Sequence, residues 1–199
     1  MNGGVRMTSE ARRKSILAAA IAIFGSRGYV GTTTDEVARA AGVSQTYVVR
    51  LFGTKEKLFL AAHEHVVERI LEAFRDAVHG ESTRGRSERM GTAYIELLAD
   101  RGLHLTLHHA FLLGGDPVIG EAARKQFARV WRFLREEAEL SVEEARDFLA
   151  RGMLVNTLVG LRLIDDYGTD PAVTEVFRAC FPADVRDIAE RLPRVGDAW

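Results

Sequence analysis

Apolar residues recur at intervals of three and four along most of the chain, and runs that alternate between apolar and polar residues are nearly absent. This spacing is typical of helices that bury one face, so we expect an all-α protein. The first predicted helix ends at Gly28, where a glycine can adopt the left-handed backbone of a helix cap. Its buried stripe is Ile16, Leu17, Ala20, Ile23 and Phe24.

Two short helices joined by a glycine follow. Thr33 and Glu36 have the spacing of a capping box, which predicts the start of the second helix. Gly42 allows a tight turn, we expect Val43 to be a buried plug, and Ser44 can cap a third helix over 45–52. Two short helices around such a turn indicate a helix-turn-helix.

A long helix over 55–78, capped by Thr54, is predicted to leave this N-terminal part. We expect five further helices, over 88–101, 103–113, 117–139, 142–167 and 171–180, and a last short turn over 184–192. Asp-Pro pairs at 116–117 and 170–171 and a second capping box, Ser141 with Glu144, indicate where three of them start. The predicted organisation is a helix-turn-helix head over 1–54 and a larger helical bundle over 55–199.

Composition narrows the class of protein. With 199 residues, 47% hydrophobic and 28% charged, the chain can bury a core and is neither disordered nor fibrous. The single Cys180 cannot form an internal disulfide and fits a reducing cytoplasm. The apolar run over 16–25 is too short to span a bilayer, and Glu10 with Arg27 argue against a signal peptide, so we expect a cytoplasmic protein.

Charge is distributed unevenly although the net charge is only −1. Residues 1–55 hold eight basic and three acidic side chains, a net charge of +5, and the rest of the chain is acidic. A basic head indicates an anionic partner, because the local field depends on where charges lie. On the helix over 45–52, Val48, Val49 and Phe52 are predicted to face the core, whereas Thr46, Tyr47 and Arg50 face outward and can hydrogen-bond base edges or phosphates. The alternative is a plain helical hairpin whose polar residues meet only water.

Three spaced motifs extend this interpretation. They are Gly28-Tyr29-x-x-Thr32-Thr33, Val37-Ala38-x-x-Ala41-Gly42-Val43-Ser44 and Phe52-x-x-Lys55-Glu56-x-Leu58. Together they closely resemble the DNA-binding head of the TetR family of bacterial repressors. The resemblance covers about residues 10–60 and implies an all-helical homodimer, whose head binds a near-palindromic operator and whose body binds a small-molecule inducer.

From the helix face and this resemblance we expect a set of DNA-binding residues, namely Thr33, Ser44, Gln45, Thr46, Tyr47, Arg50 and Lys55. The chain departs from the family where the recognition helix usually reads Leu-Tyr-x-His-Phe, because Val49 and Leu51 replace the tyrosine and the histidine. The phosphate contacts common in the family are therefore not transferred to these two positions. Lys55 keeps the family's residue at a helix N-terminus, a place suited to phosphate.

The body resembles the family less closely, and its sites are expectations from helical spacing. A mostly apolar inducer would be lined by Leu98, Leu107, Phe111, Phe127 and Trp131, with polar contacts from His108 or Asn156. A filled core without a ligand is the alternative. The last two long helices carry apolar residues nearly all round, which predicts a dimer contact at Leu154, Leu158, Leu161 and Phe177.

Other classes of site find little support. His104 and His108 are one helical turn apart but lack a third ligand, so we expect no metal and no cofactor. The glycine, serine and Glu-x-x-His signatures of common enzymes are absent from the sequence, so we do not expect an enzyme. The sequence thus favours a ligand-responsive repressor; the alternatives are a regulator without a ligand, an all-helical enzyme and an interaction module.

Overall fold

The computed structural model describes residues 8–80 and 83–181, together with positions 188, 190, 192 and 194. Regular structure in these residues is helical, as the apolar spacing predicted. The helices are α1 (Ser9–Arg27), α2 (Thr34–Ala40), α3 (Gln45–Phe52), α4 (Lys55–His79), α5 (Arg86–Glu96), α6 (Leu103–Leu112), α7 (Pro117–Arg132), α8 (Val142–Gly160) and α9 (Pro171–Cys180).

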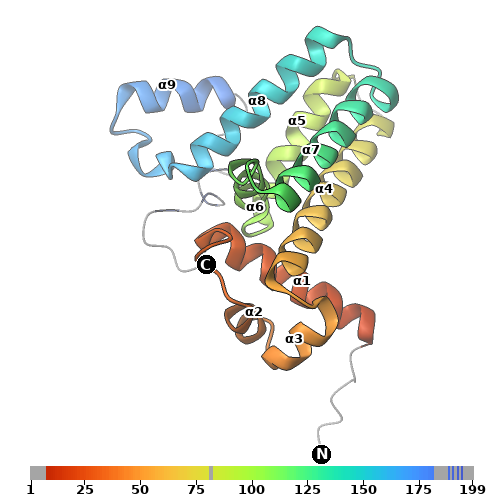
Figure 1. Ribbon diagram of the computed structural model, residues 1–199. Helices are drawn as coiled ribbons and strands as arrows, with labels where there is room; N and C mark the ends of the chain where they lie inside the picture. The colour runs from red at the N-terminus through yellow and green to blue at the C-terminus, as the bar shows by residue number, and fades with distance from the viewer. Residues whose placement is uncertain are drawn as a thin grey trace, which may run out of the picture.

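The head, which we define as α1 to α3, lies at one end of the molecule (Figure 1). Its core joins α1 to the start of α4 through aromatic rings. Phe24 and Phe59 meet edge to face with 4.9 Å between centroids, and the Tyr29 ring lies 5.2 Å from Phe59. Because Phe24 and Phe59 are fully buried, this contact sets how α4 leaves the head.

The body, defined as α4 to α9, is a helical bundle built along α4 (Figure 1). The long α4 passes from the head into the body, and α5 and α7 lie beside it. The helix α8 crosses this group and leads to α9, which lies on the side away from α4. At the start of α4 the Thr54 hydroxyl accepts a hydrogen bond from the Lys57 amide, which is the cap expected for this helix.

Several expected helix ends were wrong. The helix expected over 117–139 changes at Phe133 into a π turn, Phe133–Glu137. The helix expected to continue to residue 167 ends at Gly160, because Arg162 adopts a left-handed backbone with φ of 57°. A short 3-10 turn, Leu163–Asp166, follows it. The turn expected over 184–192 lies mostly outside the described residues.

The helix α6 packs directly on α1 of the head. Two glycines allow this approach, because a Cβ on Gly102 would lie 2.4 Å from the carbonyl oxygen of Ile21, and one on Gly25 would lie 2.5 Å from the Cα of Gly102. The buried Thr106 hydroxyl donates a hydrogen bond to the Ile21 carbonyl at 2.8 Å. The Nε2 of His109 donates to the Gly25 carbonyl at 3.3 Å. The head is therefore joined to the body by α6 as well as by α4.

The described helices were also compared with the requirements of a membrane span. Each of them is too short or too polar to cross a lipid bilayer.

Candidate nucleic-acid interface and cavity

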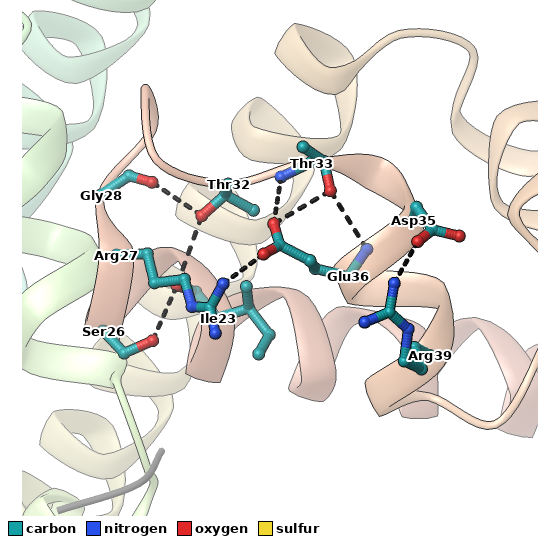
Figure 2. A network of polar contacts seen from close by, with 9 residues as sticks. All are labelled: Ile23, Ser26, Arg27, Gly28, Thr32, Thr33, Asp35, Glu36 and Arg39. Atoms are coloured by element: carbon teal, nitrogen blue, oxygen red, sulfur yellow. Dashed lines mark hydrogen bonds and ion pairs between the residues drawn. The ribbon is translucent and has the colours of Figure 1, made fainter.

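A network of polar contacts fixes α2 against the end of α1 (Figure 2). The Glu36 carboxylate accepts hydrogen bonds from the Thr33 amide at 2.8 Å and from the Thr33 hydroxyl at 2.9 Å, and it pairs with Arg27. The Thr33 amide is the main reason that the pKa of Glu36 is lowered. The buried Thr32 hydroxyl donates to the Gly28 carbonyl at 2.7 Å. The capping box predicted from the sequence is thus present, and Arg27 extends it to α1.

The recognition helix α3 is held by two apolar residues and presents polar residues outward. Val48 is fully buried and Phe52 is nearly so. The Ser44 hydroxyl caps the helix by accepting from the Tyr47 amide at 3.2 Å. The exposed residues include Gln45, Thr46 and Arg50. The side chains that can reach a DNA groove are therefore fixed on a rigid, capped helix.

Two inward positions expected in this part were wrong. Val49 was expected to face the core, but 43% of it is exposed. At 100° per residue it lies about 100° from Val48, which turns it out of the core. Val43, expected as a buried plug, is only half-buried.

Arginines of α1 reach α3, a contact that the sequence analysis did not foresee. The guanidinium of Arg12 lies 5.7 Å from the centroid of the Tyr47 ring, and Arg50 approaches the same ring at 4.9 Å. Arg13 lies 4.6 Å from the Phe52 ring centroid. These cation-π contacts place positive charge beside the recognition helix. The basic residues Arg12 and Arg13 near the start of α1 were the available signal, but helical spacing could not link them to residue 47.

Thr33 is the N-cap of α2, and Lys55 is the first residue of α4. The Lys55 ammonium donates a hydrogen bond to the Tyr29 carbonyl at 3.0 Å and lies 4.5 Å from the Tyr29 ring centroid. This anchors its charge at the N-terminus of α4, where backbone N–H groups also favour an anion. Gln45 is tied to α2, because its Nε2 donates to the Thr34 hydroxyl at 3.1 Å.

The body encloses a narrow apolar cavity of about 60 Å³. It lies among α4, α5, α6, α7 and α8, and most of its lining is aliphatic or aromatic. The apolar side chains in its lining include Val67, Ile70, Phe74, Val130, Phe148, Leu149 and Met153. Phe127 also lines it and is 45% exposed, so this side chain lies where the cavity meets the surface.

A few polar groups line this cavity. The buried Tyr94 hydroxyl donates to Asn156 Oδ1 at 2.8 Å. By contrast, His63 Nε2 and Gln126 Oε1 are buried without a hydrogen-bond partner among the described residues. Burial lowers the pKa of His63 to about 4, so its ring is neutral at physiological pH. An apolar cavity with a few unsatisfied polar atoms is suited to a largely apolar molecule that carries a hydrogen-bonding group.

The structure brings only some of the expected ligand-binding residues together. Leu107, Phe111, Phe127 and Asn156 line the cavity. Leu98, His108 and Trp131 are not in its lining: Leu98 lines a smaller pocket near Leu103, whereas Trp131 and His108 are half-buried. The analysis of the sequence missed His63 and Gln126. The apolar stripe of α4 contained the signal that residue 63 is inward.

The expected dimer residues also divide into two groups. Leu154 and Leu161 are 39% and 64% exposed and are available to a second subunit. Leu158 and Phe177 are buried inside the subunit, and the Phe177 ring packs against Phe181 and Tyr167. Their assignment to a dimer surface is therefore corrected, because apolar spacing alone does not distinguish a core face from an interface.

One of the histidines considered as metal ligands, His104, is bonded within the core. His104 is buried, and its Nε2 donates to the Tyr94 carbonyl at 3.1 Å. Burial lowers its pKa to about 4. Within the described ranges, no three His, Cys, Asp or Glu side chains gather in a way that could hold a metal ion.

Comparisons with known proteins match this architecture. Residues 16–62 match the family model described as bacterial regulatory proteins, tetR family. The HTH-type transcriptional activator FasR of Mycolicibacterium smegmatis is 32% identical over 90 residues, which cover 45% of this chain and 40% of FasR. The HTH-type transcriptional regulator RutR of Escherichia coli K12 is 36% identical over 69 residues, covering 33% of this chain and 32% of RutR. Each match thus spans less than half of the relative.

The fold extends beyond the head. The crystal structure of a TetR-like transcriptional regulator from Rhodococcus sp. RHA1 superposes with a TM-score of 0.57 at 19% identity, covering 92% of each chain. At that identity the likeness concerns the fold alone. The family-model match lies over α1 to α4, which contain the capping box, the glycine turn and the capped recognition helix. Residues 16–62 thus form a head of the kind found in bacterial regulatory proteins of the tetR family.

Proposed function

We propose that the protein is a transcriptional regulator that binds duplex DNA through α3. The observation that carries this proposal is the exposed face of α3, where Gln45, Thr46 and Arg50 project from a helix anchored by Val48 and Phe52. Hydroxyl, amide and guanidinium groups are those that read base edges in the major groove. Arg12 and Arg13 beside α3 add the positive charge that phosphates require. Such a regulator acts where the chromosome is, in the cytoplasm.

The proposed functional unit is a homodimer that places two α3 helices in two half-sites of a near-palindromic operator. Leu154 and Leu161 support a contact through α8, since both are exposed and are two helical turns apart on one face. The head would then be the DNA-binding part, and the region from residue 55 onward the ligand-binding and dimerisation part.

The DNA proposal is tested with Arg50→Ala. An operator is first selected from a random duplex library, and affinity is then measured by fluorescence anisotropy. We expect Arg50→Ala to weaken binding about tenfold or more, because a lost arginine contact costs about 1–3 kcal/mol. Binding of the unmodified protein should also fall steeply as salt rises, since each phosphate contact releases counterions.

Arg146→Ala is the matched control, because Arg146 is an exposed arginine on α8 that pairs with its neighbour Asp147. It should leave affinity unchanged. Equal affinity for the selected operator and for unrelated DNA, insensitive to salt, would contradict the proposal.

We further propose that a small, largely apolar molecule in the cavity weakens DNA binding, which makes the protein a repressor released by its ligand. The support is the position of α6: Leu107 and Phe111 line the cavity, while Thr106 and His109 of the same helix hold α1. A ligand that shifts α6 would therefore move the head as well. By linkage, DNA must weaken ligand binding by the same factor. A regulator without a ligand is the second candidate. It is favoured by the small volume of the cavity, about 60 Å³, because ordinary ligand sites have volumes of roughly 300–1,000 Å³.

Indole, a small neutral ring system with one N–H donor, is a probe that distinguishes the repressor released by a ligand from the regulator without a ligand. We expect calorimetry to detect one indole per subunit, and Met153→Trp to weaken binding at least tenfold by filling the cavity from within its lining. Leu112→Trp is the control, because Leu112 is 70% exposed. A tryptophan at this position adds the same side chain on the surface, outside the cavity. Absence of binding, or equal binding by both variants, would favour the regulator without a ligand.

A further inference from the structure

We infer that Val49 reads the methyl group of a thymine in the major groove and so fixes one A·T pair of the operator half-site. The inference rests on the proposed binding of DNA through α3 and names a specificity residue within it.

Val49 lies in the middle of the surface that α3 presents. By helical geometry it is about 40° from Gln45 and about 60° from Thr46 around the axis. It is 43% exposed, while its neighbour Val48 is fully buried. A single exposed valine is ordinary on a protein surface. Here, however, the surrounding exposed residues are polar and basic, so an apolar branched side chain is set among groups that can hydrogen-bond.

The chemistry of the groove defines what this side chain can recognise. Valine has no donor or acceptor, so it cannot bond a base edge or a phosphate. The apolar group on the major-groove edge of a base pair is the C5 methyl of thymine, which cytosine lacks. Contact between the valine methyls and this group removes apolar surface from water on both sides. The pair read by Val49 adjoins those within reach of Thr46 and Arg50.

Deoxyuridine supplies the test, because it keeps the hydrogen-bonding edge of thymine and lacks only the methyl. Each thymine of the selected operator is replaced in turn, symmetrically in both half-sites, and dissociation constants are measured. For the unmodified protein we expect a loss of about fourfold per half-site, hence about fifteenfold in all, at one position. Val49→Ala should bind the thymine operator correspondingly more weakly and lose the discrimination at that position.

Val30→Ala is the matched control. Val30 is 84% exposed in the turn between α1 and α2, so the substitution removes the same atoms from the head but away from α3. It should keep the full discrimination against deoxyuridine. Discrimination by Val49→Ala equal to that of the unmodified protein, or insensitivity of the unmodified protein at every thymine of a specific operator, would overturn the inference and leave the proposed function intact. Failure to select any specific DNA would overturn both.

Discussion

Gly102→Ala is expected to destabilise the protein by about 3 kcal/mol or more, because it separates α6 from α1. The new Cβ would lie 2.4 Å from the Ile21 carbonyl oxygen and 2.9 Å from the Ala22 Cα. Both are backbone atoms, so no side chain can rotate to relieve the overlap. Gly102 also has a φ of 76°, which costs alanine about a further 1 kcal/mol. Urea denaturation at equilibrium measures the change, which should lower the midpoint.

Gly91→Ala is the control for this substitution. Gly91 lies inside α5, and a Cβ there would meet no atom within 4 Å. Alanine in a helix is favoured over glycine by up to about 1 kcal/mol, so stability should rise. A similar change for both variants would show that α6 and α1 are not in the close contact described.

The free energy of unfolding is expected to be nearly constant between about pH 7 and 8 and to fall steeply towards pH 5. His63 and His104 have pKa values lowered to about 4 because burial penalises the charged ring, against 6.5 in the unfolded chain. The unfolded chain therefore binds protons first, and stability is lost as pH falls through 6.5. Each histidine contributes up to about 1.4 kcal/mol per pH unit to the slope of the free energy of unfolding. Between pH 6.5 and 4 this amounts to about 3 kcal/mol for each histidine. Carboxylates with a lowered pKa, such as Glu36, change the free energy of unfolding mainly below pH 4.5. They therefore contribute little between pH 7 and 5.

His63→Leu removes one contribution, so its slope between pH 6.5 and 5 should be smaller than that of the unmodified protein, in which burial also lowers the pKa values of His104, His65 and His109. It also removes a buried nitrogen that lacks a partner among the described residues, which limits its cost at pH 8. Met90→Leu is the control: a fully buried, volume-conserving substitution should shift stability slightly and keep the slope. A flat profile down to pH 5 would contradict the assignment of neutral, desolvated rings.

Patterns within one or two turns of helix were reliable guides. The capping boxes at Thr33 and Ser141 and the Asp-Pro starts at residues 116 and 170 are present in the structure. These signals could be found in the sequence because a cap or an N-terminal proline satisfies backbone groups only a few residues away. The helix-turn-helix and its family were recognisable for the same reason, since the whole motif is contiguous.

Tertiary structure decided which apolar and aromatic residues meet. Periodicity assigned Phe177 and Leu158 to an interface and Trp131 to a cavity, yet the first two are core residues and Trp131 lies outside the cavity lining. The sequence determined by itself that the protein is all-helical, with a basic helix-turn-helix head. Only packing between distant helices determined that His63 and Gln126 line a cavity, that Arg12 meets Tyr47, and that α6 lies against α1. The physical reason is that a helical stripe specifies which side is buried, whereas its partner depends on contacts between residues far apart in the chain.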